Sequence, residues 1–237
     1  MTAILPPNLI DSRYVKTSDH IKPSALIKNS WAEVLFTVNN FFSVYECQSW
    51  IQYCNSVGFT EVNSNESYEF AKRKQGRLQM DLNETASAIF HRLHSIIPPD
   101  LDGRRAVGCS SNIRIYRYLP GQCFGKHIDE SNIDPQGRGA TQLTVLVYLN
   151  GEEGLASSKT QTTNTNSLSG GNTVFYRDVS TISRKKSAKK EPEIFAVITP
   201  VAGKVLVHAH GRRCLTHEAA AVVQGVKYVL RTDVVYG

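Results

Sequence analysis

The sequence predicts a mainly β fold with flanking helices, and three observations support this. After residue 101 the chain consists of short β-rich runs separated by Gly, Pro or Asn. Before that point, two stretches show apolar residues at the spacing of amphipathic helices. No segment reads as a linker between two hydrophobic cores. Short strands at this spacing are typical of a β sandwich or barrel and not of a βαβ array.

The N-terminal part of the chain divides into an arm, a strand, a loop and two helices. Residues 1–30 are polar, contain three Pro and show no periodicity, so we expect an irregular arm there. Residues 31–237 are predicted to form one domain, which begins with a strand at 34–38. The polar and basic segment 60–83 is predicted to be a loop with short strands. Residues 84–97 predict an amphipathic helix that ends at two Pro.

The other predicted helix, at residues 41–57, carries signals at both ends. Ser43 with Glu46 three residues later forms the pattern of a capping box, and Gly58 is a typical stop. One face of this helix is apolar, because apolar residues recur at about 3.6-residue spacing. They are Val44, Cys47, Ile51 and Cys54.

The β-rich part contains seven predicted strands and two long segments of unusual composition. The strands are expected at residues 112–118, 142–149, 173–176, 194–199, 204–208, 222–223 and 226–236. Residues 151–171 are rich in Ser, Thr, Asn and Gly, which is typical of a flexible loop. Residues 181–191 form a second loop, which is basic.

Charge and composition limit the classes of protein that fit. The formal net charge is +6, but residues 181–191 alone carry five bases and one acid. The remaining chain therefore sums to only +2, and no aromatic residue lies among the bases of that loop. A solvated loop explains this better than a nucleic-acid-binding surface.

Further limits come from the apolar runs and the cysteines. The longest apolar runs, at 144–149 and 219–223, are far shorter than the ~20 residues that cross a bilayer. The first residues lack the pattern of a signal peptide. The five cysteines are irregularly spaced and include no CxxC pair, as expected for free thiols in a reducing compartment. We therefore expect no membrane association and a cytoplasmic or nuclear location.

The candidate chemistry centres on His127 and Asp129. In a strand, residues i and i+2 point to the same side, so this imidazole and this carboxylate can be directed at one point. Two His and one carboxylate form the facial triad of non-haem Fe(II) oxygenases, which leaves three coordination positions open. His208, His210 and His217 compete for the place of the second His.

A series of further motifs surrounds this pair in a fixed order. They are Tyr-x-Pro-Gly-Gln at 118–122, Tyr-Leu-Asn at 148–150, Gly-Gly-x-Thr-x-Phe at 170–175, Pro-x-x-Gly at 200–203, a distal His and Gly-x-Lys at 225–227. With these motifs in this order, residues 31–237 resemble the prolyl-4-hydroxylase-like branch of the 2-oxoglutarate- and Fe(II)-dependent dioxygenases. The resemblance implies a double-stranded β-helix core, a cupin-like jelly roll, with the N-terminal helices packed on it.

The resemblance also implies a set of site residues. His127, Asp129 and His217 match the iron ligands. Lys227, ten residues after the distal His, matches the basic residue that pairs with the far carboxylate of 2-oxoglutarate. Tyr118, nine residues before His127, matches a tyrosine that hydrogen-bonds the same carboxylate.

Other residues of the predicted pocket are less specific. Arg231 shares a strand face with Lys227 and is the alternative partner of the cosubstrate, because an Arg would offer a bidentate fork. Tyr116, Thr144 and Thr173 are candidate pocket-lining residues.

The activity implied is oxidative decarboxylation of 2-oxoglutarate to succinate and CO₂, coupled to hydroxylation of a C–H bond. Fe(II) is the implied cofactor, 2-oxoglutarate and O₂ are the co-substrates, and ascorbate is the expected reductant. The expected substrate is a peptidyl residue such as proline, with a small molecule as a further option. The alternatives are a nucleic-acid demethylase and a non-catalytic metal-binding interaction module. Such demethylases place an Arg about seventeen residues after the distal His, where this chain has Val234.

Overall fold

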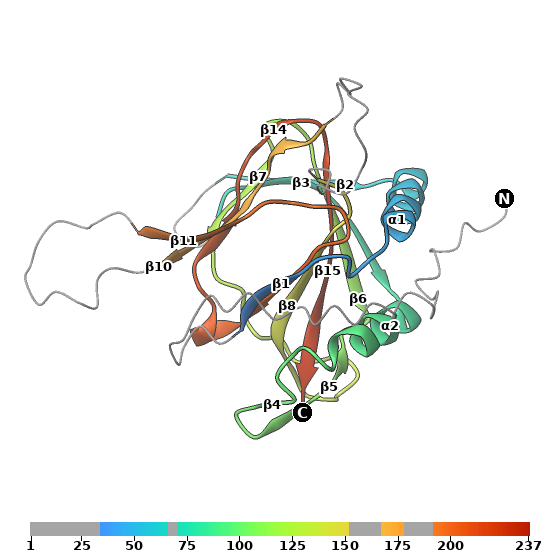
Figure 1. The fold of residues 1–237 in the computed structure, drawn as a ribbon, viewed down its shortest axis with the longest axis vertical. Coiled ribbons are helices and arrows are strands. Elements are labelled where there is room, and N and C mark those ends of the chain that lie inside the picture. The colour runs from blue at the N-terminus through green and yellow to red at the C-terminus, as the bar shows by residue number, and fades with distance from the viewer. Residues whose placement is uncertain (1–33, 66–70, 152–166, 178–191) are drawn as a thin grey trace, which may run out of the picture.

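The structure of this chain is a computed structural model, shown in Figure 1. The residues that it describes are 34–65, 71–151, 167–177 and 192–237. The predicted arm at 1–30 and the basic loop at 181–191 lie outside these residues, as does most of the predicted loop at 151–171.

Helix α1 (Val44–Val57) confirms the predicted capping box. The Glu46 backbone N–H donates to Ser43 Oγ at 3.1 Å, and the Ser43 N–H donates to Glu46 Oε2 at 2.8 Å. The chain leaves the helix at Gly58 with a φ of 94°, a conformation that favours glycine. The buried face of the helix contains Cys47, Trp50 and Cys54, whereas Val44, which was predicted to lie on the apolar face, is 61% exposed.

Helix α2 (Asn83–Leu93) ends four residues earlier than predicted. Residues 94–97 form turns instead, because the chain must leave the helical conformation before Pro98. Arg92 connects α2 to α1 through an ion pair with Glu46 at 2.6 Å, and it also donates to the Phe41 carbonyl oxygen at 2.9 Å. No helix in the described part of the chain is long and apolar enough to cross a bilayer.

The strands pair in antiparallel fashion throughout the described residues. They are β1 (Leu35–Val38), β2 (Thr60–Ser64), β3 (Arg73–Asp81), β4 (Asp100–Leu101), β5 (Arg104–Cys109), β6 (Asn112–Tyr118), β7 (Cys123–His127), β8 (Ala140–Tyr148), β9 (Ser169–Gly170), β10 (Thr173–Arg177), β11 (Glu193–Ile198), β12 (Val205–Ala209), β13 (His217–Ala219), β14 (Val222–Gln224) and β15 (Lys227–Tyr236). The main sheet runs in the order β1-β12-β8-β15-β6-β3-β7-β13-β10-β11, and β9 pairs separately with β14.

All seven strands predicted after residue 101 are present within two residues of their expected bounds. The sequence missed β4, β5, β7, β9 and β13, which are mostly short. Residues 60–83 were predicted to be a loop with short strands, but β3 in this segment has nine residues and lies between β6 and β7 in the main sheet. Leu78 and Met80 of β3 pack on the core, whereas Gln75 and Arg77 lie on the opposite face. Polar side chains on the inner face of the sheet therefore concealed this strand.

The helices cover the outer face of one half of the sheet, on the right of Figure 1. Trp50 of α1 and Ile89 of α2 are fully buried in one core with Ile115, Val145 and Leu230 of the strands. The other half of the sheet, from β7 to β11, curls over the inner face of the same strands. This is the predicted jelly-roll core with N-terminal helices packed on it, and its inner face is free to form a pocket.

Candidate metal and cosubstrate site

A pocket lies on the inner face of the curled sheet. It encloses about 450 Å³ of space, part of it open to solvent. Both halves of the sheet contribute to its lining. The lining residues are Tyr116, Tyr118, Phe124, His127, Asp129, Leu146, Tyr148, Thr173, His217, Ala219, Lys227, Val229 and Arg231. All but one of the site residues expected from the sequence are in this set, the exception being Thr144.

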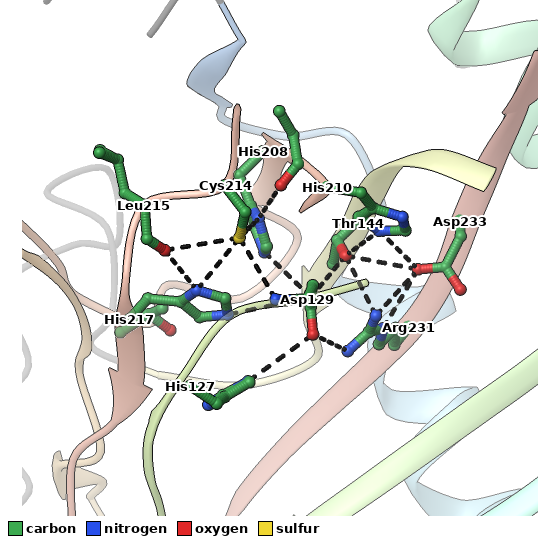
Figure 2. Close-up of polar contacts among 12 residues, drawn as sticks. His127, Asp129, Thr144, His208, His210, Cys214, Leu215, His217, Arg231 and Asp233 are labelled. Carbon is green, nitrogen blue, oxygen red and sulfur yellow. Dashed lines mark hydrogen bonds and ion pairs between the residues drawn. The ribbon is translucent and has the colours of Figure 1, made fainter. Parts of the chain in front are cut away.

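Three of these residues bring metal-ligating atoms together. His127 at the end of β7 pairs directly with His217 at the start of β13, and Asp129 follows two residues after His127. One ligand atom from each of the three residues lies within 4.8 Å of the others (Figure 2). The neighbouring ends of two antiparallel strands therefore bring together the His-x-Asp pair and His217, the three residues that the resemblance implied.

Hydrogen bonds fix which nitrogen of each ring faces the cluster. Nδ1 of His127 lies 2.8 Å from the Gly125 carbonyl oxygen, and Nδ1 of His217 lies 2.9 Å from that of Leu215. A carbonyl oxygen only accepts, so both Nδ1 atoms carry the proton and both Nε2 atoms present a lone pair. This is the arrangement that orients histidine ligands in metal sites.

The distances suit a divalent cation. The two Nε2 atoms lie 3.7 Å (His127) and 3.9 Å (His217) from the oxygens of Asp129. Two ligand atoms that are each about 2.1 Å from one ion can be at most about 4.2 Å apart. Two imidazoles and one carboxylate with open positions beside them are a donor set that suits Fe(II). The residues present therefore fit the metal that the resemblance implies.

Electrostatics favour the ligating forms of these side chains. Burial, together with the neighbouring His217, lowers the pKa of His127 to about 4, and burial also lowers the pKa of His217. Both rings are therefore neutral near pH 7, as metal binding requires. Burial alone would raise the pKa of Asp129, but the Arg231 guanidinium holds that pKa well below its usual range.

The guanidinium of Arg231, on β15, contacts two carboxylates. Its Nη1 donates to Asp129 Oδ1 at 3.1 Å, and its Nε and Nη2 donate to Asp233 Oδ1 at 3.2 Å. Asp233 also forms an ion pair with Arg114 of β6. Arg231 thus connects the carboxylate of the candidate metal cluster to a buried ion-pair network.

Thr144 of β8 lies behind Asp129 and does not line the pocket. Its hydroxyl donates to Asp129 Oδ2 at 2.7 Å and receives a hydrogen bond from Arg231 Nη2 at 3.1 Å. The cross-strand register explains this, because Thr144 pairs with Asp233 of β15. Thr144 therefore orients the carboxylate.

Lys227, at the other end of the pocket, has no acidic partner among the described residues. The side chain is 1% exposed. Its Nζ donates to the Gly171 carbonyl oxygen at 2.5 Å and lies 5.3 and 5.5 Å from the ring centroids of Tyr118 and Tyr148. Burial lowers the pKa of this amine to about 7. The hydroxyls of Tyr148 and Thr173 lie 2.7 Å apart in the lining of the same pocket.

The sequence did not single out several residues of this site. Phe124 stacks on the ring of His127 at a centroid distance of 3.7 Å. Cys214 lies 3.7 Å from His217 Nδ1, and its sulfur accepts from the Asp129 N–H at 3.4 Å. Burial raises the pKa of this thiol to about 12, so it remains protonated. Tyr148 was visible only as part of the Tyr-Leu-Asn motif, and nothing local marked Phe124 or Cys214.

Comparison with known proteins supports the fold. No protein-family pattern and no curated protein sequence matches the chain. A solved structure of a viral collagen prolyl hydroxylase from Paramecium Bursaria Chlorella virus-1, as a 2OG complex, is 17% identical, with a TM-score of 0.50. The match covers 87% of this chain and 96% of the viral chain. A Trichoplax adhaerens prolyl hydroxylase, in complex with a peptide fragment of hypoxia inducible factor, is also 17% identical, with a TM-score of 0.53. That match covers 85% of this chain and 83% of the other.

At this level of identity, the two structures establish a shared fold. The chain has the jelly-roll fold of these prolyl hydroxylases, as predicted.

Proposed function

We propose that this chain is a 2-oxoglutarate- and Fe(II)-dependent dioxygenase that hydroxylates a C–H bond of a peptidyl residue such as proline. The observation that carries the proposal is the buried amine of Lys227, which faces the pocket of the His127–Asp129–His217 cluster without an acidic partner among the described residues. A dicarboxylate that reaches from the metal to this amine would supply the missing charge.

In the proposed site, the three clustered side chains hold the metal from one side. His127, Asp129 and His217 would bind Fe(II) and leave open positions toward the pocket. When bound, Fe(II) with 2-oxoglutarate and O₂ supplies the oxidative chemistry that yields succinate, CO₂ and a hydroxylated product. The chain itself contributes orientation, charge and the exclusion of water.

Lys227 and Arg231 then take different roles. Lys227 binds the far carboxylate of 2-oxoglutarate, in a buried setting where an ion pair is strong. The ring of Tyr118 lies beside that amine, and its hydroxyl would hydrogen-bond the same carboxylate. Arg231 directs its donors to Asp129 and Asp233 and so holds the metal-ligating carboxylate in place.

The substrate class has weaker support than the reaction class. The Trichoplax adhaerens prolyl hydroxylase, which has a similar fold, was solved in complex with a peptide fragment. This favours a peptide substrate for the present chain. The nucleic-acid alternative depended on the basic loop at 181–191, which lies outside the described residues. The non-catalytic alternative predicted a defective ligand set, whereas all three ligating side chains are present and close together. Ascorbate remains the expected reductant.

The test is succinate formation from 2-oxoglutarate by the purified chain with Fe(II), ascorbate and air. Uncoupled turnover allows this assay without a known substrate. We expect succinate from the wild type, none from His127→Ala, and a strongly raised KM for 2-oxoglutarate in Lys227→Ala. The matched control is His94→Ala, which removes an exposed histidine outside the cluster. It should behave as the wild type.

Addition of proline-containing peptides then tests the substrate, with a gain of one oxygen atom in the peptide mass as the readout. No succinate, together with no binding of 2-oxoglutarate in the presence of Mn(II) without O₂, would overturn the proposed function.

A further inference from the structure

The inner face of β3 carries several polar groups without partners. Arg73, Gln75 and Arg77 alternate along this strand, so their side chains share one face. Four buried side-chain atoms on this face have no hydrogen-bond partner among the described residues: Nε of Arg73, Nε of Arg77 and both amide atoms of Gln75. Three of the four are donors. Native proteins leave few buried polar groups unpaired, so this face is short of acceptors.

Arg73 and Arg77 also differ from the other arginines of the described chain. Eight arginines there are half-buried, and six of them form ion pairs with carboxylates. These six are Arg92, Arg114, Arg117, Arg138, Arg213 and Arg231. Arg77 donates to the amide oxygen of Gln79. Arg73 forms no hydrogen bond and no ion pair with a described side chain, so it has the least compensated guanidinium of the eight.

Arg73 lies beside the pocket of the proposed active site. It pairs directly with Phe124 of β7. Its guanidinium carbon lies 4.2 Å from the ring centroid of Phe124 and 5.8 Å from that of Tyr116, and both rings line the pocket. His127 stacks on Phe124 at 3.7 Å and occupies one face of that ring, so the guanidinium lies over the other face. One aromatic ring therefore separates this cation from a proposed metal ligand.

The missing partner of Arg73 has the chemistry of a carboxylate. Aromatic rings attract a cation but offer it no acceptor atom, whereas a carboxylate can accept two parallel hydrogen bonds from a guanidinium. Lys227, which is 1% exposed, already serves the far carboxylate of 2-oxoglutarate in the proposed function. Arg73 is half-buried and remains accessible to a ligand that enters from solvent. In the proposed function, that ligand is a peptide.

We propose that Arg73 binds a glutamate or aspartate side chain of the peptide substrate, so that peptides with acidic residues beside the target residue are preferred. The inference rests on the proposed function and names its substrate class. An acidic side chain would supply the carboxylate that the fold provides for six other half-buried arginines and not for this one. Arg73 is then a specificity residue, separate from the metal ligands and from Lys227.

The test compares two fluorescent peptides that each contain one central proline. One peptide has glutamate at the positions that flank the proline, and the other has glutamine there. Fluorescence anisotropy gives the Kd of each for the protein with Mn(II) and 2-oxoglutarate in the absence of O₂. We expect the wild type to bind the glutamate peptide about 10-fold more tightly, and Arg73→Gln to bind both peptides within about 2-fold of each other.

Three further variants sharpen the comparison. Lys74→Gln is the matched control, because it removes the same charge from an exposed side chain on the opposite face of β3, and it should keep the wild-type preference. Arg73→Lys retains the charge without the fork and should keep part of the preference, which provides a second variant if Arg73→Gln fails to fold. Arg73→Glu should instead favour a peptide with lysine at the flanking positions.

Equal binding of the two peptides by the wild type would overturn the proposal, and this outcome needs no variant. A preference for glutamate that persists in Arg73→Gln would overturn it as well. A raised KM for 2-oxoglutarate in Arg73→Gln, with an unchanged peptide preference, would assign Arg73 to the cosubstrate instead. In each of these cases, succinate formation by the wild type would leave the proposed function standing. Absence of both succinate and 2-oxoglutarate binding would remove the proposed function and this inference with it.

Discussion

Two cations on the inner face of β15, Lys227 and Arg231, have opposite surroundings. They are four residues apart in the strand, about 13 Å along it, and point to the same side. Arg231 contacts two carboxylates, those of Asp129 and Asp233. Lys227 contacts a carbonyl oxygen and two tyrosine rings, and no carboxylate among the described residues.

The difference is between a cation that is compensated within the fold and one that is not. A buried cation whose donors reach carboxylates is compensated within the fold, whereas a buried cation without an acid costs folding free energy. A protein retains such a cost where function requires it, and perturbed groups in pockets mark candidate sites for this reason. The cation beside the His127–Asp129–His217 cluster is thus compensated within the fold, and in the proposed function an anion from outside compensates Lys227.

The largest expected effect concerns the compensated cation. Arg231→Met leaves Asp129 and Asp233 buried without their main partner, and we expect the free energy of unfolding to fall by about 3–5 kcal/mol. Urea denaturation measures this. Arg231→Lys should recover only part of the loss, because a single ammonium cannot reproduce the fork that reaches both carboxylates. Wild-type stability in Arg231→Met would mean that the network does not hold the fold.

The second prediction concerns binding at the other end. Lys227→Met should weaken 2-oxoglutarate binding roughly 100-fold or more, since loss of one partner of a buried charge pair costs about 2–5 kcal/mol. Calorimetry with Mn(II) in the absence of O₂ gives the Kd directly. Lys227→Arg, which keeps the charge, should retain part of the affinity. An unchanged Kd in Lys227→Met would transfer the cosubstrate contact to Arg231.

Lys227 should also impose a pH dependence on stability. Its pKa is about 7 in the folded protein against an ordinary value of 10.5. Between these two values the unfolded chain binds more protons than the folded one, so the free energy of unfolding rises with pH across this window. Below pH 7 both states carry the proton, and the folded state bears the full cost, at most about 5 kcal/mol.

The comparison with Lys227→Met isolates this contribution from other titrating groups. The variant lacks the cost of the buried charge but also lacks the hydrogen bond to Gly171. With both effects counted, its free energy of unfolding near pH 6.5 should exceed that of the wild type by about 1–3 kcal/mol. The gap should close as the pH approaches 10. Urea titrations of both proteins at four pH values test this, and a gap that stays constant with pH would contradict the unpaired charge.

Local chemistry explains which parts of this molecule could be predicted from its sequence. The capping box of α1 and both bounds of β6 depend on residues close together in the chain, and both were predicted. The length of β3 was underestimated because its inner-face residues are polar, so the alternation of apolar residues is incomplete.

The candidate site shows the same division. The clustering of His127, Asp129 and His217 was anticipated from the ordered motifs. The ten-residue spacing from the distal His favoured Lys227 over Arg231 as the partner of the cosubstrate, but it left Arg231 open because both lie on one strand face. Asp129, which distinguishes them, is 102 positions from Arg231 in the chain, so only the tertiary structure shows which cation is compensated.

The smallest expected effect compares one hydroxyl from each end of the pocket. Thr144→Val removes the hydrogen bond to Asp129 Oδ2 at 2.7 Å, and Thr173→Val removes the one between Thr173 and Tyr148 at 2.7 Å. Each change should lower the free energy of unfolding by about 1–2 kcal/mol. Only Thr144→Val should weaken Mn(II) binding, by roughly 10-fold, because it alone orients a proposed metal ligand.

Calorimetric titration of both variants with Mn(II) separates the two ends of the pocket. Equal losses of metal affinity would mean that the two ends of the pocket are coupled through the sheet. Lys227 and Arg231 would then belong to one coupled network and could not be treated as independent. A loss confined to Thr144→Val would show that the compensated end is set by Asp129 and its donors, and that the cation at the other end can be altered without disturbing the metal.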